Sequence, residues 1–201
     1  MIRASLICLI SFITITSTAQ QTAFENAVNN LFFNVDIKKA SDRIITAFLS
    51  TKALHCNDTV TRQFGIDVHM RLHTDSEAWT DRYIFIFTES PLKGLKIDSG
   101  YILVSIDETD STRKLHGINW VVQFTSKKDG QAFFKEIKKI FAPVSTKQKL
   151  EHDKLLSESA QYSTRNTIAR GIRDVAFTLS KSAKTKKYEL RLYLMNEFIF
   201  R

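Results

Sequence analysis

The chain has 201 residues, a hydrophobic share of 43% and a formal net charge of +8. This composition excludes a collagen-like repeat and a largely disordered chain, and no stretch approaches the ~20 consecutive apolar residues of a membrane-spanning helix. None of the six glycines lies in a G-x-G-x-x-G, G-x-x-x-x-G-K-[ST] or G-x-S-x-G pattern. We therefore expect neither a glycine-rich nucleotide loop nor the nucleophile elbow of an α/β-hydrolase.

Residues 1–19 have the features of a cleavable secretory signal peptide. Arg3 makes the start basic, an apolar segment runs from Leu6 to Ile15, and Ser17 and Ala19 are small residues suited to signal peptidase. We therefore predict that the protein is exported to the periplasm or the extracellular space.

Two helices are predicted next. Residues 22–34 place apolar side chains at helical spacing opposite polar ones, which is typical of an amphipathic helix. A second helix is expected to begin at Asp36 or Ser41 and to carry the apolar residues from Ile44 to Leu49. Residues 51–64 show no clean period, so we expect a connection there.

From Ile66 onward the hydrophobic period changes to two, which indicates strands. Strands are predicted over residues 66–73, 83–87, 101–106 and 118–124, with a polar turn over residues 74–81. The segment 83–87 is apolar at every position and is therefore expected at the centre of a sheet. A helix is predicted over residues 128–141, ending before Pro143.

The second part of the chain resembles the first in its hydrophobic pattern. Apolar positions of residues 23–35 recur in residues 132–144, and two strand patterns recur at similar offsets. We therefore predict an internal duplication with two tandem helix-helix-hairpin units, residues 20–126 and 127–201, as separate domains or as one. The alternative is that helices and strands of this kind resemble one another by pattern alone. The predicted fold class is α+β, with one or two antiparallel sheets and helices packed on one face.

Charge is divided unevenly along the chain. Residues 20–110 carry 9 Lys and Arg against 13 Asp and Glu, whereas residues 111–201 carry 19 against 8. This asymmetry predicts a dipolar molecule with one cationic region. The last hairpin turn is the most basic segment, and we predict that it contacts a partner through Lys181, Lys184, Lys186 and Lys187. The alternative is that these lysines only keep this half of the chain soluble.

Trp79 is the other candidate contact residue. It falls in the predicted polar turn at 74–81, where we expect its ring to be exposed and able to stack on a ligand.

No set of residues predicts a catalytic, metal or cofactor site. Cys56 is the single cysteine after the signal peptide and is expected to be a small, half-buried side chain. His69 and His73 fall on a predicted strand, which separates them too widely for one tetrahedral ion. Carboxylates gather in residues 75–81 and 107–110, where hairpin turns are expected and Asp is common.

Three functions follow as hypotheses. The first is an exported, non-enzymatic binding module whose basic C-terminal half contacts an anionic envelope polymer, a lipid headgroup or an acidic protein. Nucleic acid is not expected, because no nucleic-acid-binding motif is present. The second is a structural or assembly subunit that self-associates through its oppositely charged halves. The third is an exported hydrolase with a cleft that sequence does not display.

Overall fold

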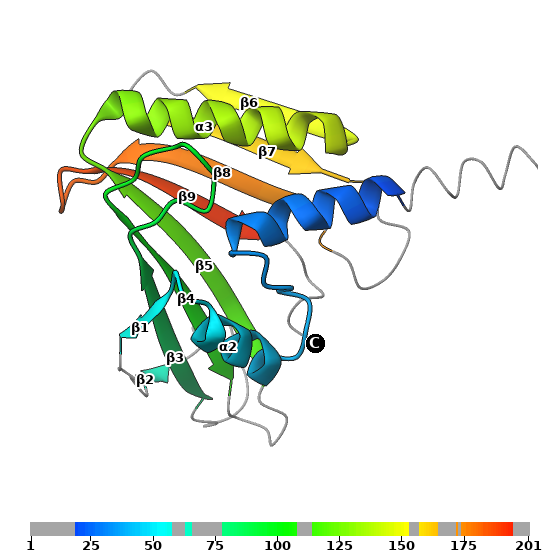
Figure 1. The fold of residues 1–201 in the computed structure, drawn as a ribbon, viewed down its shortest axis with the longest axis vertical. Helices are drawn as coiled ribbons and strands as arrows, with labels where there is room; N and C mark the ends of the chain where they lie inside the picture. The colour runs from blue at the N-terminus through cyan, green and yellow to red at the C-terminus, as the bar shows by residue number, and fades with distance from the viewer. Residues whose placement is uncertain are drawn as a thin grey trace, which may run out of the picture.

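The structure, a computed structural model, describes residues 19–57, 63–65, 78–107, 114–152, 157–164, 172 and 174–194. Three helices and nine strands are present in this part of the chain (Figure 1). The helices are residues 19–31, α2 (Ser41–Ser50) and α3 (Lys127–Phe141), which continues into the 3-10 turn η2 (Ala142–Val144). The strands are β1 (His55–Asn57), β2 (Gln63–Gly65), β3 (Ala78–Phe87), β4 (Ser99–Asp107), β5 (Lys114–Phe124), β6 (Lys147–His152), β7 (Glu158–Ser163), β8 (Asp174–Lys181) and β9 (Tyr188–Leu194). No helix of this part is long and apolar enough to span a membrane.

All nine strands belong to one antiparallel sheet. Eight follow the order β1-β3-β4-β5-β9-β8-β7-β6, and β2 also pairs with β3. The long strand β5 joins the strands that precede it in sequence to those that follow it, because it pairs with both β4 and β9 (Figure 1). The two predicted units, residues 20–126 and 127–201, therefore contribute strands to one uninterrupted sheet.

The helices cover one face of this sheet. The register aligns a row of fully or almost fully buried side chains across β3, β4, β5, β9 and β8, namely Phe85, Ile102, Trp120, Leu192 and Phe177. Phe48 of α2 packs on Phe85, with 5.1 Å between ring centroids, and Phe133 of α3 packs on Trp120 at 6.1 Å. The α+β class with helices against one antiparallel sheet is thus confirmed.

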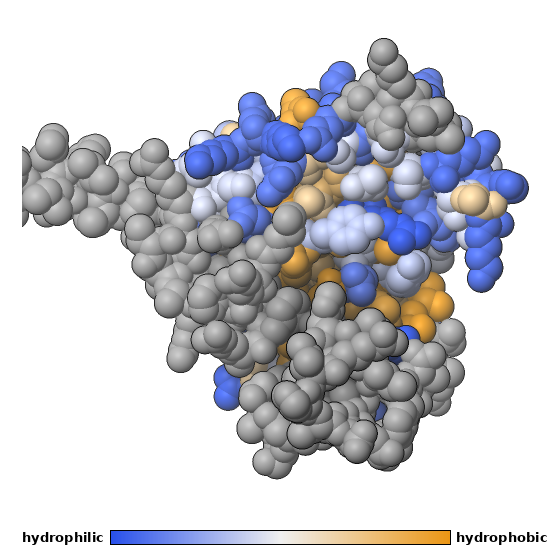
Figure 2. All heavy atoms as spheres, turned by 180° about the vertical axis from the view of Figure 1, so that it is seen from behind, coloured by the Kyte–Doolittle hydropathy of each residue, from blue (hydrophilic) through white to orange (hydrophobic). Residues whose placement is uncertain are grey.

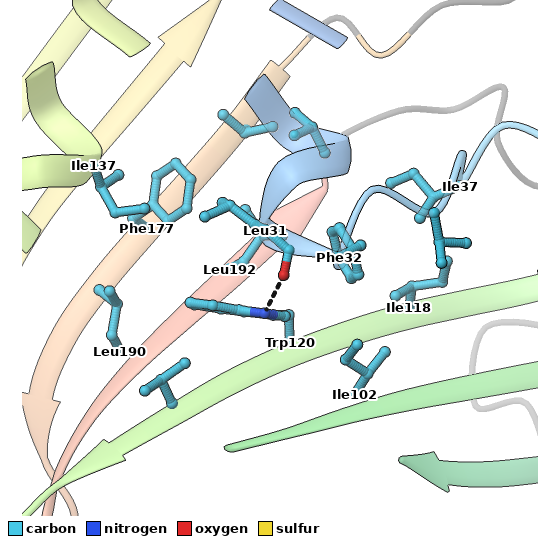
Figure 3. Packing of buried hydrophobic residues seen from close by; sticks show 14 of the residues in the cluster. Leu31, Phe32, Ile37, Ile102, Ile118, Trp120, Ile137, Phe177, Leu190 and Leu192 are labelled. Carbon is cyan, nitrogen blue, oxygen red and sulfur yellow. Dashed lines mark hydrogen bonds between the residues drawn. The ribbon is translucent and has the colours of Figure 1, made fainter. Parts of the chain in front are cut away.

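Trp120 also fixes the helix of residues 19–31. Its indole nitrogen donates a hydrogen bond of 3.0 Å to the main-chain oxygen of Leu31, while the ring lies in the buried core beside Leu192 (Figure 3). The last carbonyls of a helix lack partners within the helix, so this bond satisfies one of them inside the core. Phe33 and Asn34 then adopt left-handed backbone angles, φ 56° and 64°, so the helix ends at residue 31 and not at the predicted residue 34.

Most predicted elements are confirmed. The second helix begins at Ser41, the strands predicted at 83–87, 101–106 and 118–124 lie within β3, β4 and β5, and the helix predicted at 128–141 is α3. β3 has neighbours on both sides, as expected for an apolar strand. The strand predicted at 66–73 lies outside the described residues.

Three predictions are not supported. Residues 51–64 are not only a connection, because β1 spans His55–Asn57 and β2 begins at Gln63. Residues 78–81 are not part of a turn, because β3 already begins at Ala78. No duplication is shown either: α3 is followed by the strands β6 and β7, whereas a repeat of the first unit requires a second helix there. Amphipathic helices and alternating strands share the same hydrophobic periods whatever their origin, which explains the resemblance in pattern.

Candidate anion-binding surface

The basic turn between β8 and β9 is a closed hairpin loop. The Ser182 amide donates to the Lys187 carbonyl at 2.8 Å, and the Lys186 amide donates to the Ser182 carbonyl at 3.0 Å. The Ser182 hydroxyl accepts a third bond from the Thr185 amide at 3.3 Å. This loop requires a left-handed residue, and Lys186 takes that place with φ 61°.

Two other segments lie beside this turn. The Asp98 amide, in the loop between β3 and β4, donates to the Gln123 carbonyl at 3.0 Å, and the Asp98 carboxylate accepts a bond of 2.5 Å from the Thr125 hydroxyl before α3. The same carboxylate lies 3.3 Å from the Lys187 ammonium group. Asp98 therefore ties together three segments that are far apart in sequence.

We call residues 88–98, 125–128 and 181–187 the lysine end. In sequence these segments carry two carboxylates, Glu89 and Asp98, and eight lysines: Lys93, Lys96, Lys127, Lys128, Lys181, Lys184, Lys186 and Lys187. Figure 2, which views the molecule from behind, shows hydrophilic side chains across the upper part of the molecule, and they extend to the right of the view, where this end of the sheet lies. The contacts of Asp98 thus bring two further lysine-bearing segments next to the turn that the sequence singled out.

The four predicted contact lysines differ in their surroundings. Lys187 is half-buried and paired with Asp98, and the Lys181 ammonium lies over the Tyr188 ring, 5.7 Å from its centroid. Lys184 and Lys186 are exposed, and neither has an ion pair with any described residue. These two lysines are therefore the most available for an external anion.

The acidic partner of Lys187 is held in its ionised form. The hydrogen bond from the Thr125 hydroxyl is the largest effect and lowers the pKa of Asp98; burial opposes it, and the hydrogen bond and charge of Lys187 lower the pKa further, so that it is lowered overall. Because Asp98 stays charged, it neutralises Lys187 and no other lysine of the turn.

A polar network on the face opposite the helices adjoins the turn. Glu189 is only 5% exposed and is held by Arg191 at 2.6 Å and by the Gln123 amide at 3.1 Å. Burial raises the pKa of Glu189, but the hydrogen bonds from Arg191 and Gln123 and the charge of Arg191 outweigh it, so that the pKa is lowered overall. Sequence reasoning did not single out this pair. The alternation of Glu189, Arg191 and Tyr193 with leucines in β9 is the signal that places them on one face.

Trp79 is not in a turn and lies far from the lysines. It belongs to β3 and pairs with Phe64 of β2, at the end of the sheet where Thr80 pairs with Asp107. The lysine turn adjoins the other end, where Phe124 pairs with Tyr188. The structure therefore does not bring Trp79 together with the predicted contact lysines.

Cys56 and the carboxylates of residues 75–81 and 107–110 do not form one group in the described part. Cys56 is half-buried in β1, Asp81 lies within β3, and Asp107 ends β4. Asp75, Glu77, Glu108 and Asp110 lie outside the described residues, as do His69 and His73. Within the described ranges no three His, Cys, Asp or Glu side chains are placed to hold a metal ion.

No protein-family model, curated protein or solved structure matches this chain.

Proposed function

We propose that this protein is an exported, non-enzymatic binding protein that contacts an anionic partner through the lysine end. The observation that supports the proposal is that three lysine-bearing segments meet at Asp98, and that Lys184 and Lys186 of the turn are exposed and have no ion pair in the described part of the chain. A concentration of like charge raises the local density of oppositely charged partners and speeds their association. The partner classes are an acidic polymer, a lipid headgroup and an acidic protein, and export rests on the signal peptide predicted at residues 1–19.

Local conformational costs at this end support a role in binding. Lys127 and Lys128 occupy the first turn of α3, where the positive end of the helix dipole disfavours cations and favours anions. Lys186 occupies a left-handed position that costs a residue with a Cβ atom about 1 kcal/mol and that glycine takes without strain. A lysine at each of these positions lowers the stability of the fold and keeps a positive charge at this end. This pattern is expected where function competes with folding.

Binding of the full chain to anionic polysaccharide, acidic lipid vesicles and a polyglutamate peptide tests the proposal. We expect one probe class to bind with an affinity that falls as salt rises, because salt screens the exposed lysines. Combining Lys184→Gln with Lys186→Gly should weaken this binding about thirtyfold, since each lysine near an anionic surface contributes ~1 kcal/mol and two are removed. As a control, Lys39→Gln removes one positive charge from an exposed residue outside the lysine end and should leave binding unchanged.

Stability separates a loss of contact from a loss of fold. Because Lys186→Gly relieves the left-handed strain, the free energy of unfolding of this variant should stay the same or rise by up to about 1 kcal/mol. Weaker binding by a protein of equal or greater stability supports the proposal. Binding that is insensitive to salt, or equally weakened by Lys39→Gln, contradicts it.

A further inference from the structure

The strand β6 forms an exposed edge of the sheet. It pairs with β7 along one side, and no described strand lies along the other. Residues 147–151 are all exposed, and Leu150 is 57% exposed although its register partner in β7, Ala160, is buried. An unpaired strand edge presents free backbone donors and acceptors to a second strand.

The charges along β6 are complementary to themselves. Lys147 and Lys149 precede Leu150 at alternate positions, and Glu151 follows it. Lys149 and Glu151 lie on the same face of the strand, 2.5 Å apart, and remain 69% and 59% exposed. The sequence continues the pattern, because Asp153 follows Glu151 at the next alternate position.

Antiparallel pairing of two β6 strands turns this order into a set of favourable contacts. With a two-fold axis at Leu150, each Lys149 faces Glu151 of the other copy and the two Leu150 side chains face each other. Directly opposed side chains in an antiparallel pair come within ≈ 4.5–5.5 Å at Cβ, so opposite charges attract and apolar side chains make contact. Any register that sets Lys149 against Lys149 brings like charges together.

We propose that two copies of this chain associate through β6, antiparallel and symmetric about Leu150, so that one sheet continues through both copies. Such an interface is isologous, which is the arrangement of most homodimers. A single strand pair buries little surface, so we expect a weak, concentration-dependent dimer. This surface is separate from the lysine end and does not depend on the proposed function.

Sedimentation velocity of the full chain over a wide concentration series tests the proposal, with three variants as comparisons. Lys149→Glu places a carboxylate at position 149 of each copy opposite the Glu151 carboxylate of the other copy, and this repulsion should abolish the dimer. Combining Lys149→Glu with Glu151→Lys restores opposite charges across the axis and should restore it. Lys135→Glu makes the same change in net charge at an exposed position of α3 and should leave the dimer unchanged. Thermal unfolding should be the same for all variants, because the substituted side chains are exposed.

Loss in the single variant and recovery in the charge swap support this interface and its register. A monomer at every concentration overturns the proposal. A dimer that persists in Lys149→Glu, or that the charge swap fails to restore, shows association through another surface and overturns it equally.

Discussion

Glu189 combines burial with ionisation, and this has a consequence for stability at low pH. Arg191 and Gln123 lower its pKa below the ordinary value of 4.5 in the folded protein. A group with a depressed folded pKa contributes stability above its unfolded pKa and loses that contribution as the pH falls through the folded pKa. We therefore expect the free energy of unfolding in urea to fall with pH from about 4.5 downward, and Glu189→Gln to flatten this dependence.

The exposed carboxylate of Glu89 provides the control for that experiment. Glu89→Gln removes the same charge from the lysine end without touching the network of Glu189. We expect its pH dependence to follow that of the wild type. If Glu189→Gln also follows the wild type, the hydrogen bonds to Glu189 do not stabilise the folded state.

At the scale of single elements, Gly100 in β4 makes room for an aromatic ring. A Cβ atom at this position would lie 2.2 Å from Cζ of Phe87 and 2.8 Å from the main-chain oxygen of Val121. The Phe87 ring cannot move freely, because it packs against Trp120 and Phe33. Gly100→Ala should therefore lower the free energy of unfolding by about 2–3 kcal/mol, the range of overpacking in a dense core.

Gly117 in β5 is the matched control for Gly100. Nothing lies within 4 Å of a Cβ atom built at Gly117, so Gly117→Ala should change stability by no more than about 0.5 kcal/mol. Urea unfolding of both variants measures the difference. Equal losses at the two positions would show that the strand backbone, rather than the Phe87 ring, determines the cost.

The helices and the central strands could be predicted because their burial is one-sided or complete. Periodicity then records which side chains face the core, as it does in α3 and β5. β6 was not predicted because residues 147–151 are exposed on both faces of an edge strand, so their hydrophobicity does not alternate. β7 was not predicted either, since only Ala160 and Tyr162 of its six residues are buried. The pairing of β5 with β9 was missed for another reason, since it depends on which strands meet in space rather than on their own patterns.

The candidate site was predicted only in part, because some of its residues come together only through contacts between distant segments. The turn lysines are close in sequence, so composition alone pointed to them. The additional lysines of residues 88–98 and 125–128 join them only through the contacts of Asp98, and the neutralisation of Lys187 by that carboxylate is also a tertiary contact. Trp79 was misplaced because a polar stretch, Asp75 to Asp81, continues into the start of β3.

At the scale of the whole molecule, the boundary between residues 126 and 127 passes through the centre of the sheet and the core. Residues 20–126 end with β5, whose partner β9 lies in residues 127–201. The same cut separates Trp120 from Leu192 and Phe133, which bury it together with the helix of residues 19–31. Each fragment alone would expose a row of apolar side chains and an unpaired central strand.

We therefore expect neither fragment, residues 20–126 or residues 127–201, to fold independently. Each should lack a cooperative urea transition and exchange its amide hydrogens rapidly, whereas the two mixed at equal concentration should regain the transition of the intact chain. Reassembly should be weakened by Trp120→Ala in the first fragment, because this removes both the contact with Phe133 and the bond to Leu31. A cooperative transition in either fragment by itself would show instead that the chain consists of two units and that the pairing of β5 with β9 is an interface between domains.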